Sequence, residues 1–400
     1  MVAAALASAG LALFAVAVRD GTFGGRSLRA ALVVVVFVGA HLAAQRAGPG
    51  AAGCALVAAG IAAAGVGLGL APPWITKAGL ALVTVAAVVA LAAGIVLLAA
   101  GHRLIARAAG GWWAIPAVLT AVVATVVVGS SLAIAIAATN PPPTALGDGT
   151  PAGRGLDFEE VEFRTLDGVN LSGWYLPPSN GAAVVLVHGA GSTRSGVLDH
   201  AEALAGGGYG VLLFDVRGHG RSGGRAMEFG WYGDLDVGAA VSFLDRRPEV
   251  EAIGAVGLSM GGEEVIGAAA TDGRIGAVVA EGATNRTAAD KAWQSEVYGL
   301  RGSVQELLDH LTFGFADLLT EAKPPISLQD ATALIAPRPM LLIAAGEVAD
   351  EGHTARRLAE AAPEAVAIWE VPGSGHVGAL DTDPDGWERT VLGFLDEALG

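Results

Sequence analysis

Residues 253–262 read IGAVGLSMGG, and this stretch decides the fold of the C-terminal half of the chain. An apolar, strand-like run ends in Gly257-Leu258-Ser259-Met260-Gly261, and a helical pattern follows it. A serine on a very sharp strand-to-helix turn needs neighbours without side chains, and glycines two residues to either side provide them. We therefore predict that the hydroxyl of Ser259 is exposed as a nucleophile and that the amide of Met260 faces a developing oxyanion.

Two further segments support this interpretation, which the glycine pattern alone would not establish in a chain with 58 glycines. Residues 184–191 read VVLVHGAG, a strand ending in a flexible turn that can present the amide of Ala190 as a second oxyanion donor. Residues 372–376 read PGSGH and follow the last predicted strand, so His376 emerges at the same sheet edge as Ser259. We expect His376 to be the general base, in the chain order serine, acid, histidine.

The surrounding pattern predicts the architecture of residues 156–400. A hairpin opens this half, and short β-branched runs then alternate with amphipathic helical stretches. Such alternation specifies a mostly parallel sheet with helices on both faces. The predicted buried strands are 183–187, 211–214, 253–257, 277–280, 340–344 and 367–371.

Residues 156–400 resemble the α/β-hydrolase fold family, in the branch that contains serine peptidase-like and dienelactone hydrolase-like esterases. The resemblance rests on FRTLDGVNLSGWYLPP, VVLVHGAG, LLFDVRGHGRSGG, VGLSMGG and VPGSGH, in the expected order and spacing. It implies serine catalysis on an ester, thioester or amide, without a metal or another cofactor. The fold hosts many chemistries, so the resemblance does not specify the substrate.

The acid of the triad departs from the pattern of this family. Relatives usually place Asp three residues after the glycine that follows the penultimate strand, which here is Ala349. Asp350 would take that place if the loop were one residue longer, and we predict that Asp350 is the acid. Glu347 is the alternative, and Glu351 is the residue to consider after these two.

A long segment, residues 282–338, separates two predicted strands. In α/β hydrolases lids commonly occur here, and we expect a lid or cap over the site. The amphipathic stretch Val304–Leu319 also fits simple packing against the sheet, or a helix resting on a bilayer.

The N-terminal third has a different composition. Five apolar runs fill residues 1–138, and the last two exceed the ~20 residues that cross a bilayer. We therefore predict a helical transmembrane region of about five spans, and the cell membrane as the location. The runs are Val2–Val18, Leu28–Gln45, Ala51–Leu70, Ala78–Ala100 and Trp112–Ala138.

Charge divides the chain at the same place. Residues 1–140 carry seven basic residues and one acidic residue, whereas the remainder carries 17 basic and 38 acidic residues. Arg103 and Arg107 precede the last run and no basic residue follows it before Arg154, which favours an extracytoplasmic C-terminal half. The basic residues summed over all loops favour neither side. Residues 139–155, rich in Pro and Gly, are predicted to be a linker.

These expectations combine into a membrane-anchored serine hydrolase that acts on a small-molecule or lipid-like acyl substrate. The alternative is a membrane receptor or scaffold whose hydrolase-like domain binds ligands without catalysis. A net charge of −15 argues against a nucleic-acid partner. Cys54 is the single cysteine, which excludes an intramolecular disulfide and a cysteine-based zinc site, and the sequence leaves the oligomeric state open.

Overall fold

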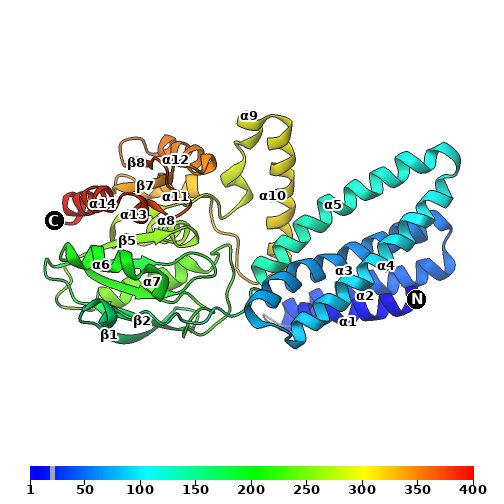
Figure 1. Ribbon diagram of the computed structural model, residues 1–400, viewed down its shortest axis with the longest axis horizontal. Helices are drawn as coiled ribbons and strands as arrows, with labels where there is room; N and C mark the ends of the chain where they lie inside the picture. Colours follow the sequence, from blue (N-terminus) through cyan, green and yellow to red (C-terminus); the bar gives the residue numbers. More distant parts are fainter. Residues whose placement is uncertain (19–22) are drawn as a thin grey trace. The chain divides into compact units, whose positions relative to one another are not determined.

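The computed structural model describes residues 1–18 and 23–400, and the chain divides into two compact units. The first unit, which we call the bundle, comprises Met1–Pro142 and Gln294–Lys323. The second, which we call the hydrolase unit, comprises Pro143–Trp293 and Pro324–Gly400. Figure 1 shows both and labels their elements.

The bundle contains the five predicted apolar helices. Among residues 1–18 and 23–142, four helical segments have the length and composition to cross a membrane, whereas α1, with 16 residues, is shorter than the ~20 needed. One boundary differs from expectation, because α3 continues through Pro72 and Pro73 where a loop was predicted. The helices are α1 Val2–Ala17, α2 Phe23–Arg46, α3 Pro49–Ala78, α4 Leu82–Ala109 and α5 Ala114–Thr139.

Small residues let α3 and α4 approach each other closely. A Cβ added at Gly67 would lie 2.5 Å from Leu91 Cβ, and one added at Gly94 would lie 2.6 Å from Ala64 N. No side chain fits at such distances, so glycine is required where the two backbones cross. Close packing of this kind holds helices together when lipid removes the hydrophobic drive between them.

Part of the segment predicted as a lid belongs to the bundle. Residues 294–323 form α9 (Gln294–Tyr298) and α10 (Leu300–Leu319), and α10 packs on α5. The hydroxyl of Ser131 donates a hydrogen bond to the carbonyl of Leu308, at 3.2 Å. The expectation that residues 282–338 are a cap within the catalytic domain is therefore wrong for 294–323, because the structure groups them with the bundle, where α10 packs on α5.

The predicted linker, residues 139–155, is also divided between the units. Asn140 closes the bundle, where its carbonyl accepts a hydrogen bond from Trp74 Nε1 at 3.1 Å. Residues 143–155 pack on the hydrolase unit, in which Thr144 forms a bridge with His219 and Arg154 forms ion pairs with Asp199 and Glu202. The Pro- and Gly-rich composition therefore marks the boundary between the two units, but much of this stretch packs on one unit or the other.

The hydrolase unit is built on one eight-stranded sheet of order β1-β2-β4-β3-β5-β6-β7-β8. The first two strands pair antiparallel with each other, β2 pairs antiparallel with β4, and the remaining pairs are parallel, as predicted. The strands are β1 Glu159–Arg164, β2 Asn170–Leu176, β3 Ala182–Val187, β4 Gly210–Phe214, β5 Ala252–Leu258, β6 Ile275–Glu281, β7 Met340–Ala345 and β8 Val366–Val371.

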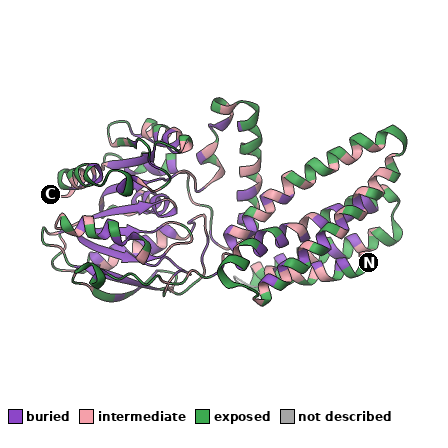
Figure 2. Cartoon of the chain, viewed as in Figure 1, coloured by how far each residue is buried: buried purple, intermediate pink, exposed green. Residues whose placement is uncertain are grey.

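Helices cover both faces of the sheet, and alternate side chains of each central strand enter different cores. Along β3, Val185 and Val187 enter one core, whereas Val184 and Leu186 enter the other. The central strands are accordingly buried throughout (Figure 2). The first core is covered by α7 Gly233–Leu244, α8 Met260–Thr271, α11 Leu328–Ile335 and α12 Ala349–Ala361, and the second by α6 Leu198–Gly206, α13 Ala379–Thr382 and α14 Pro384–Leu399.

Candidate active site

Ser259 lies on the turn between β5 and α8, with φ 54° and ψ −122°. A positive φ is rare for a residue with a side chain, and it is typical of strained turns at functional sites. The flanking glycines make this turn feasible. A Cβ at Gly257 would lie 2.1 Å from the carbonyl oxygen of Gly261, and one at Gly261 would lie 2.4 Å from that of Val187.

His376 follows β8 and reaches Ser259, as the sequence predicts. Its Nε2 lies 2.9 Å from Ser259 Oγ, within hydrogen-bond distance. Gly282 allows this approach, because a Cβ there would lie 2.9 Å from His376 Cε1. The imidazole is half exposed, so a molecule arriving from solvent can reach both side chains.

The carboxylate beside the imidazole is that of Glu351, where the sequence had favoured Asp350. Oε1 of Glu351 lies 2.5 Å from His376 Nδ1, and Oε2 accepts a hydrogen bond from the amide of Ala345 at 2.8 Å. This side chain is buried, with 1% of its surface exposed. The contacts with His376 and with the amide of Ala345, together with burial, hold the carboxylate in one position beside the ring.

The two acids that the sequence ranked higher have other contacts. Asp350 is the neighbour of Glu351 on the first turn of α12, and its carboxylate lies 3.7 Å from Lys291 Nζ. Consecutive helical residues point about 100° apart, so Asp350 and Glu351 cannot both face the sheet edge. Glu347 precedes α12, and its amide donates to the carbonyl of Ser374, which supports the loop that carries His376.

Glu351 also sets the charge state of the imidazole. Its hydrogen bond to Nδ1 raises the pKa of His376 above the usual value, and this effect outweighs the opposing effect of partial burial. The imidazolium is therefore favoured when a proton reaches the ring. A histidine between a serine hydroxyl and a buried carboxylate can accept the proton of that hydroxyl.

The two predicted oxyanion donors belong to segments that adjoin Ser259. Met260 is the first residue of α8, and a first-turn amide has no acceptor within its own helix. Ala190 follows Gly189, where a Cβ would lie 3.2 Å from Ser259 Cβ. His188 holds this turn in place, because its Nε2 accepts a hydrogen bond from the amide of Val216, and burial lowers its pKa to about 3.

Two buried carboxyl groups behind the site were not predicted to have a role there. Glu263 Oε1 accepts hydrogen bonds from the amides of Thr284 and Asn285, and Glu281 Oε1 accepts one from Ala379. Burial raises the pKa of each carboxyl to about 7. The hydrogen bonds of Glu263 hold the loop after β6 in place, and the hydrogen bond of Glu281 holds the loop after His376. The position of Glu281 at the end of a parallel strand was the sequence signal for its location.

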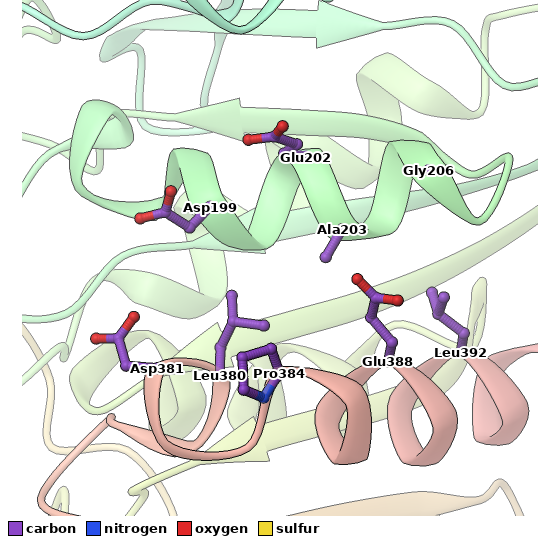
Figure 3. A pocket seen from close by; sticks show the side chains of 9 residues that line it. All are labelled: Asp199, Glu202, Ala203, Gly206, Leu380, Asp381, Pro384, Glu388 and Leu392. Carbon is purple, nitrogen blue, oxygen red and sulfur yellow. The ribbon is translucent and has the colours of Figure 1, made fainter.

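A cavity elsewhere on the hydrolase unit contains neither Ser259 nor His376. It measures about 530 Å³ and lies between α6 and α13–α14, where Asp199, Glu202, Asp381 and Glu388 line it (Figure 3). Among residues 1–18 and 23–400, no group of three or more His, Cys, Asp or Glu side chains is arranged to hold a metal ion.

The sheet order, the serine turn and the histidine after the last strand show that the hydrolase unit has the α/β-hydrolase fold. Residues 178–314 are similar to the serine aminopeptidase family S33.

Individual relatives agree with this assignment. A thiohydrolase, aneE, of Aspergillus aculeatus is 39% identical over 133 residues, which cover 30% of this chain and 40% of the relative. The polyketide transferase ATR5 of Stachybotrys chlorohalonatus is 38% identical over 133 residues, or 30% of this chain and 43% of the relative. The chain thus spans less than half the length of these two curated relatives. The Pyrococcus furiosus esterase Pf2001 is 28% identical with a TM-score of 0.51, covering 66% of this chain and 98% of the esterase.

Proposed function

We propose that this protein is a membrane-anchored serine hydrolase that cleaves a carboxylic ester, thioester or amide through an acyl-enzyme on Ser259. One observation carries the proposal. Nε2 of His376 lies 2.9 Å from Ser259 Oγ while Nδ1 lies 2.5 Å from Glu351 Oε1. Serine, histidine and acid in this row form a catalytic triad, which is recognised by geometry and not by sequence position.

In the proposed reaction, His376 takes the hydroxyl proton as Ser259 Oγ attacks the carbonyl carbon of the substrate. Glu351 keeps the proton of the neutral ring on Nδ1, so that Nε2 is free to accept, and it stabilises the imidazolium that forms. The amides of Ala190 and Met260 stabilise the tetrahedral oxyanion, each by ~3 kcal/mol. The imidazolium then protonates the leaving group, and water attacks the acyl-enzyme with the same histidine as base.

The relatives support acyl chemistry of this kind. One is named a thiohydrolase, one a polyketide transferase and one an esterase. All three names are consistent with one chemistry, in which serine carries an acyl group and passes it to water or to another acceptor. The half-exposed imidazole and the positive φ of Ser259 support a role of this serine as the nucleophile in such chemistry.

The anchor rests on four helical segments of 24 to 30 residues, each long and apolar enough to cross a membrane. Location in the cell membrane would bring the enzyme close to lipid-like acyl substrates. We propose an extracytoplasmic hydrolase unit, on the ground that Arg103 and Arg107 precede the last apolar helix and no basic residue follows it before Arg154.

The test is labelling of the full-length protein in detergent with a fluorophosphonate probe, which reacts with activated serines. We expect stoichiometric labelling that is lost in Ser259→Ala and retained in Asp350→Asn. A series of p-nitrophenyl esters of rising chain length then defines the acyl preference. A folded protein that takes no label and turns over no ester would support the receptor or scaffold instead.

A further inference from the structure

The amphipathic helix α10 has an apolar stripe on one side. Residues spaced three and four apart line this stripe, and Leu300, Val304 and Leu307 are 82%, 46% and 51% exposed. Such exposure is unusual for a row of large apolar side chains in water. We call the stripe the α10 stripe; its members are Leu300, Val304, Leu307, Leu311, Phe315 and Leu318.

Burial falls on the opposite side of the same helix. Gly302, Thr312, Phe313 and Ala316 are the buried residues of α10, and at 100° per residue they lie opposite the α10 stripe. The helix therefore does not bury its main apolar face among the residues that the structure describes. In a folded protein at equilibrium this face needs an apolar environment of another kind.

The C-terminal end of the stripe faces an apolar cavity of the bundle. Phe315 and Leu318 line a cavity of about 260 Å³ together with residues of four membrane helices. Its walls are almost entirely apolar, so a water molecule there would find few hydrogen-bond partners. The lining also includes Val16 of α1, Arg29 and Leu32 of α2, Val66 of α3 and Leu132 of α5.

The N-terminal end of the stripe continues from this cavity away from helices α1 to α5. The buried part of α5 lies between Gly129 and Thr139, so α10 meets α5 near the C-terminal end of that helix. In Figure 1, α10 meets α5 near the C-terminal end of α5, and the two helices diverge from there at an angle. A helix that meets the end of a spanning helix at an angle has the placement of an element in the membrane interface.

We infer that α10 is an interfacial helix, whose stripe enters the acyl region of one leaflet while a lipid chain fills the cavity beside Phe315 and Leu318. This inference rests on the membrane anchoring proposed above. The polar side of α10 carries Glu306, Asp309 and Asp317 against Arg301, so it offers no excess of positive charge to anionic headgroups. The apolar stripe is then the binding element, and zwitterionic lipid suffices as its partner.

The insertion also adds chain connections between the units. Residues 294–323 leave the hydrolase unit between β6 and β7 and return to it, so the chain passes between the units three times. An interfacial α10 gives the hydrolase unit a second membrane attachment, next in sequence to the loop that Glu263 braces.

The test places an environment-sensitive fluorophore at single cysteines in the full chain with Cys54→Ser, reconstituted in phosphatidylcholine vesicles. Val304→Cys and Leu307→Cys report on the stripe, and Gln305→Cys on the polar side of the same turn is the matched control. Val123→Cys, on the exposed surface of α5, reports whether the bundle inserts at all. Quencher-bearing lipids carry the quencher either near the headgroup or near the chain end.

We expect blue-shifted emission at positions 304 and 307, quenched more strongly by the shallow than by the deep quencher, with weaker quenching at 305. Emission at 304 and 307 like that at 305 overturns the inference. So does a blue shift that neither lipid quenches, because protein would then cover the stripe. Quenching at 123 without quenching at 304 overturns the placement of α10 alone, whereas no quenching at 123 contradicts the proposed anchor.

Discussion

The bundle and the hydrolase unit use glycine for different structural purposes. In the bundle, Gly67 and Gly94 lie inside helices, where the absence of a side chain lets α3 and α4 touch. In the hydrolase unit, Gly257 and Gly261 flank a turn, where its absence lets Ser259 adopt a positive φ. The same residue serves helix association in one unit and the position of the proposed nucleophile in the other.

Burial differs between the units in a parallel way. Strands of the hydrolase unit are enclosed by helices on both faces, and residues such as Val184 and Leu213 are 0% exposed. Helix α5 leaves Leu119 and Val123 about 60% exposed, and Figure 2 shows the contrast. A unit in water must cover its apolar side chains with protein, and the exposed apolar side chains of the bundle fit the membrane anchoring proposed above. Each prediction below tests whether a feature belongs to one unit alone.

The largest effect is expected at the nucleophile. Ser259→Ala removes one exposed hydroxyl and should lower turnover of an activated ester by on the order of 10⁶, because no other group forms the acyl-enzyme. Thermal unfolding of the variant should match that of the parent. Turnover within tenfold of the parent would remove Ser259 from the role of nucleophile.

A smaller loss is expected at the acid. Glu351→Gln should lower turnover by up to ~10⁴, because the amide no longer fixes the Nδ1–H tautomer of His376. Asp350→Asn and Glu347→Gln are the matched controls and should stay near the parent level. A large loss in Asp350→Asn with a normal Glu351→Gln would show that the loop before α12 rearranges in the working enzyme.

Within the bundle, Gly67→Ala should destabilise by about 1–3 kcal/mol, since its methyl group has no room against Leu91. Gly39→Ala is the control, because a Cβ there meets nothing within 4 Å and alanine favours the helix. Unfolding in detergent measures both. The turnover number of either variant on a soluble ester should equal that of the parent, and a loss in Gly67→Ala would show that the units are coupled.

The pH profile gives a more modest effect. Catalysis needs the neutral imidazole, so kcat/KM should fall as pH drops through the pKa of His376. Glu351 raises that pKa, and Glu351→Gln should therefore move the acid limb of the residual activity to lower pH. A limb that stays in place, or moves to higher pH, would show that Glu351 does not interact with the ring in solution.

The least change in activity is expected when the bundle is removed. A chain of residues 143–400, in which a short Gly/Ser segment replaces 294–323, should keep the turnover number of the parent on a soluble ester. The same chain with 294–323 retained should require detergent, because the α10 stripe is exposed. If both chains behave alike in water, the stripe is not the membrane-binding element.

Local patterns in the sequence determined much of this molecule. The strand and turn around Ser259 could be predicted because a nucleophile on a sharp turn requires glycines at fixed spacing, whatever the rest of the chain does. The position of His376 followed in the same way, since parallel strands end at one edge of the sheet. The apolar helices were predictable because helix length and composition in a membrane depend on the segment alone.

Tertiary structure decided what depended on distant partners. Asp350 and Glu351 are adjacent carboxylates, and only the start of α12 at Ala349 determines which of them faces His376, 25 residues further on. Residues 300–319 are amphipathic whether they cover a sheet or rest beside membrane helices, so their pattern could not assign them to the bundle. Sequence periodicity specifies which face of a helix is apolar, but the partner of that face is set by packing across the whole chain.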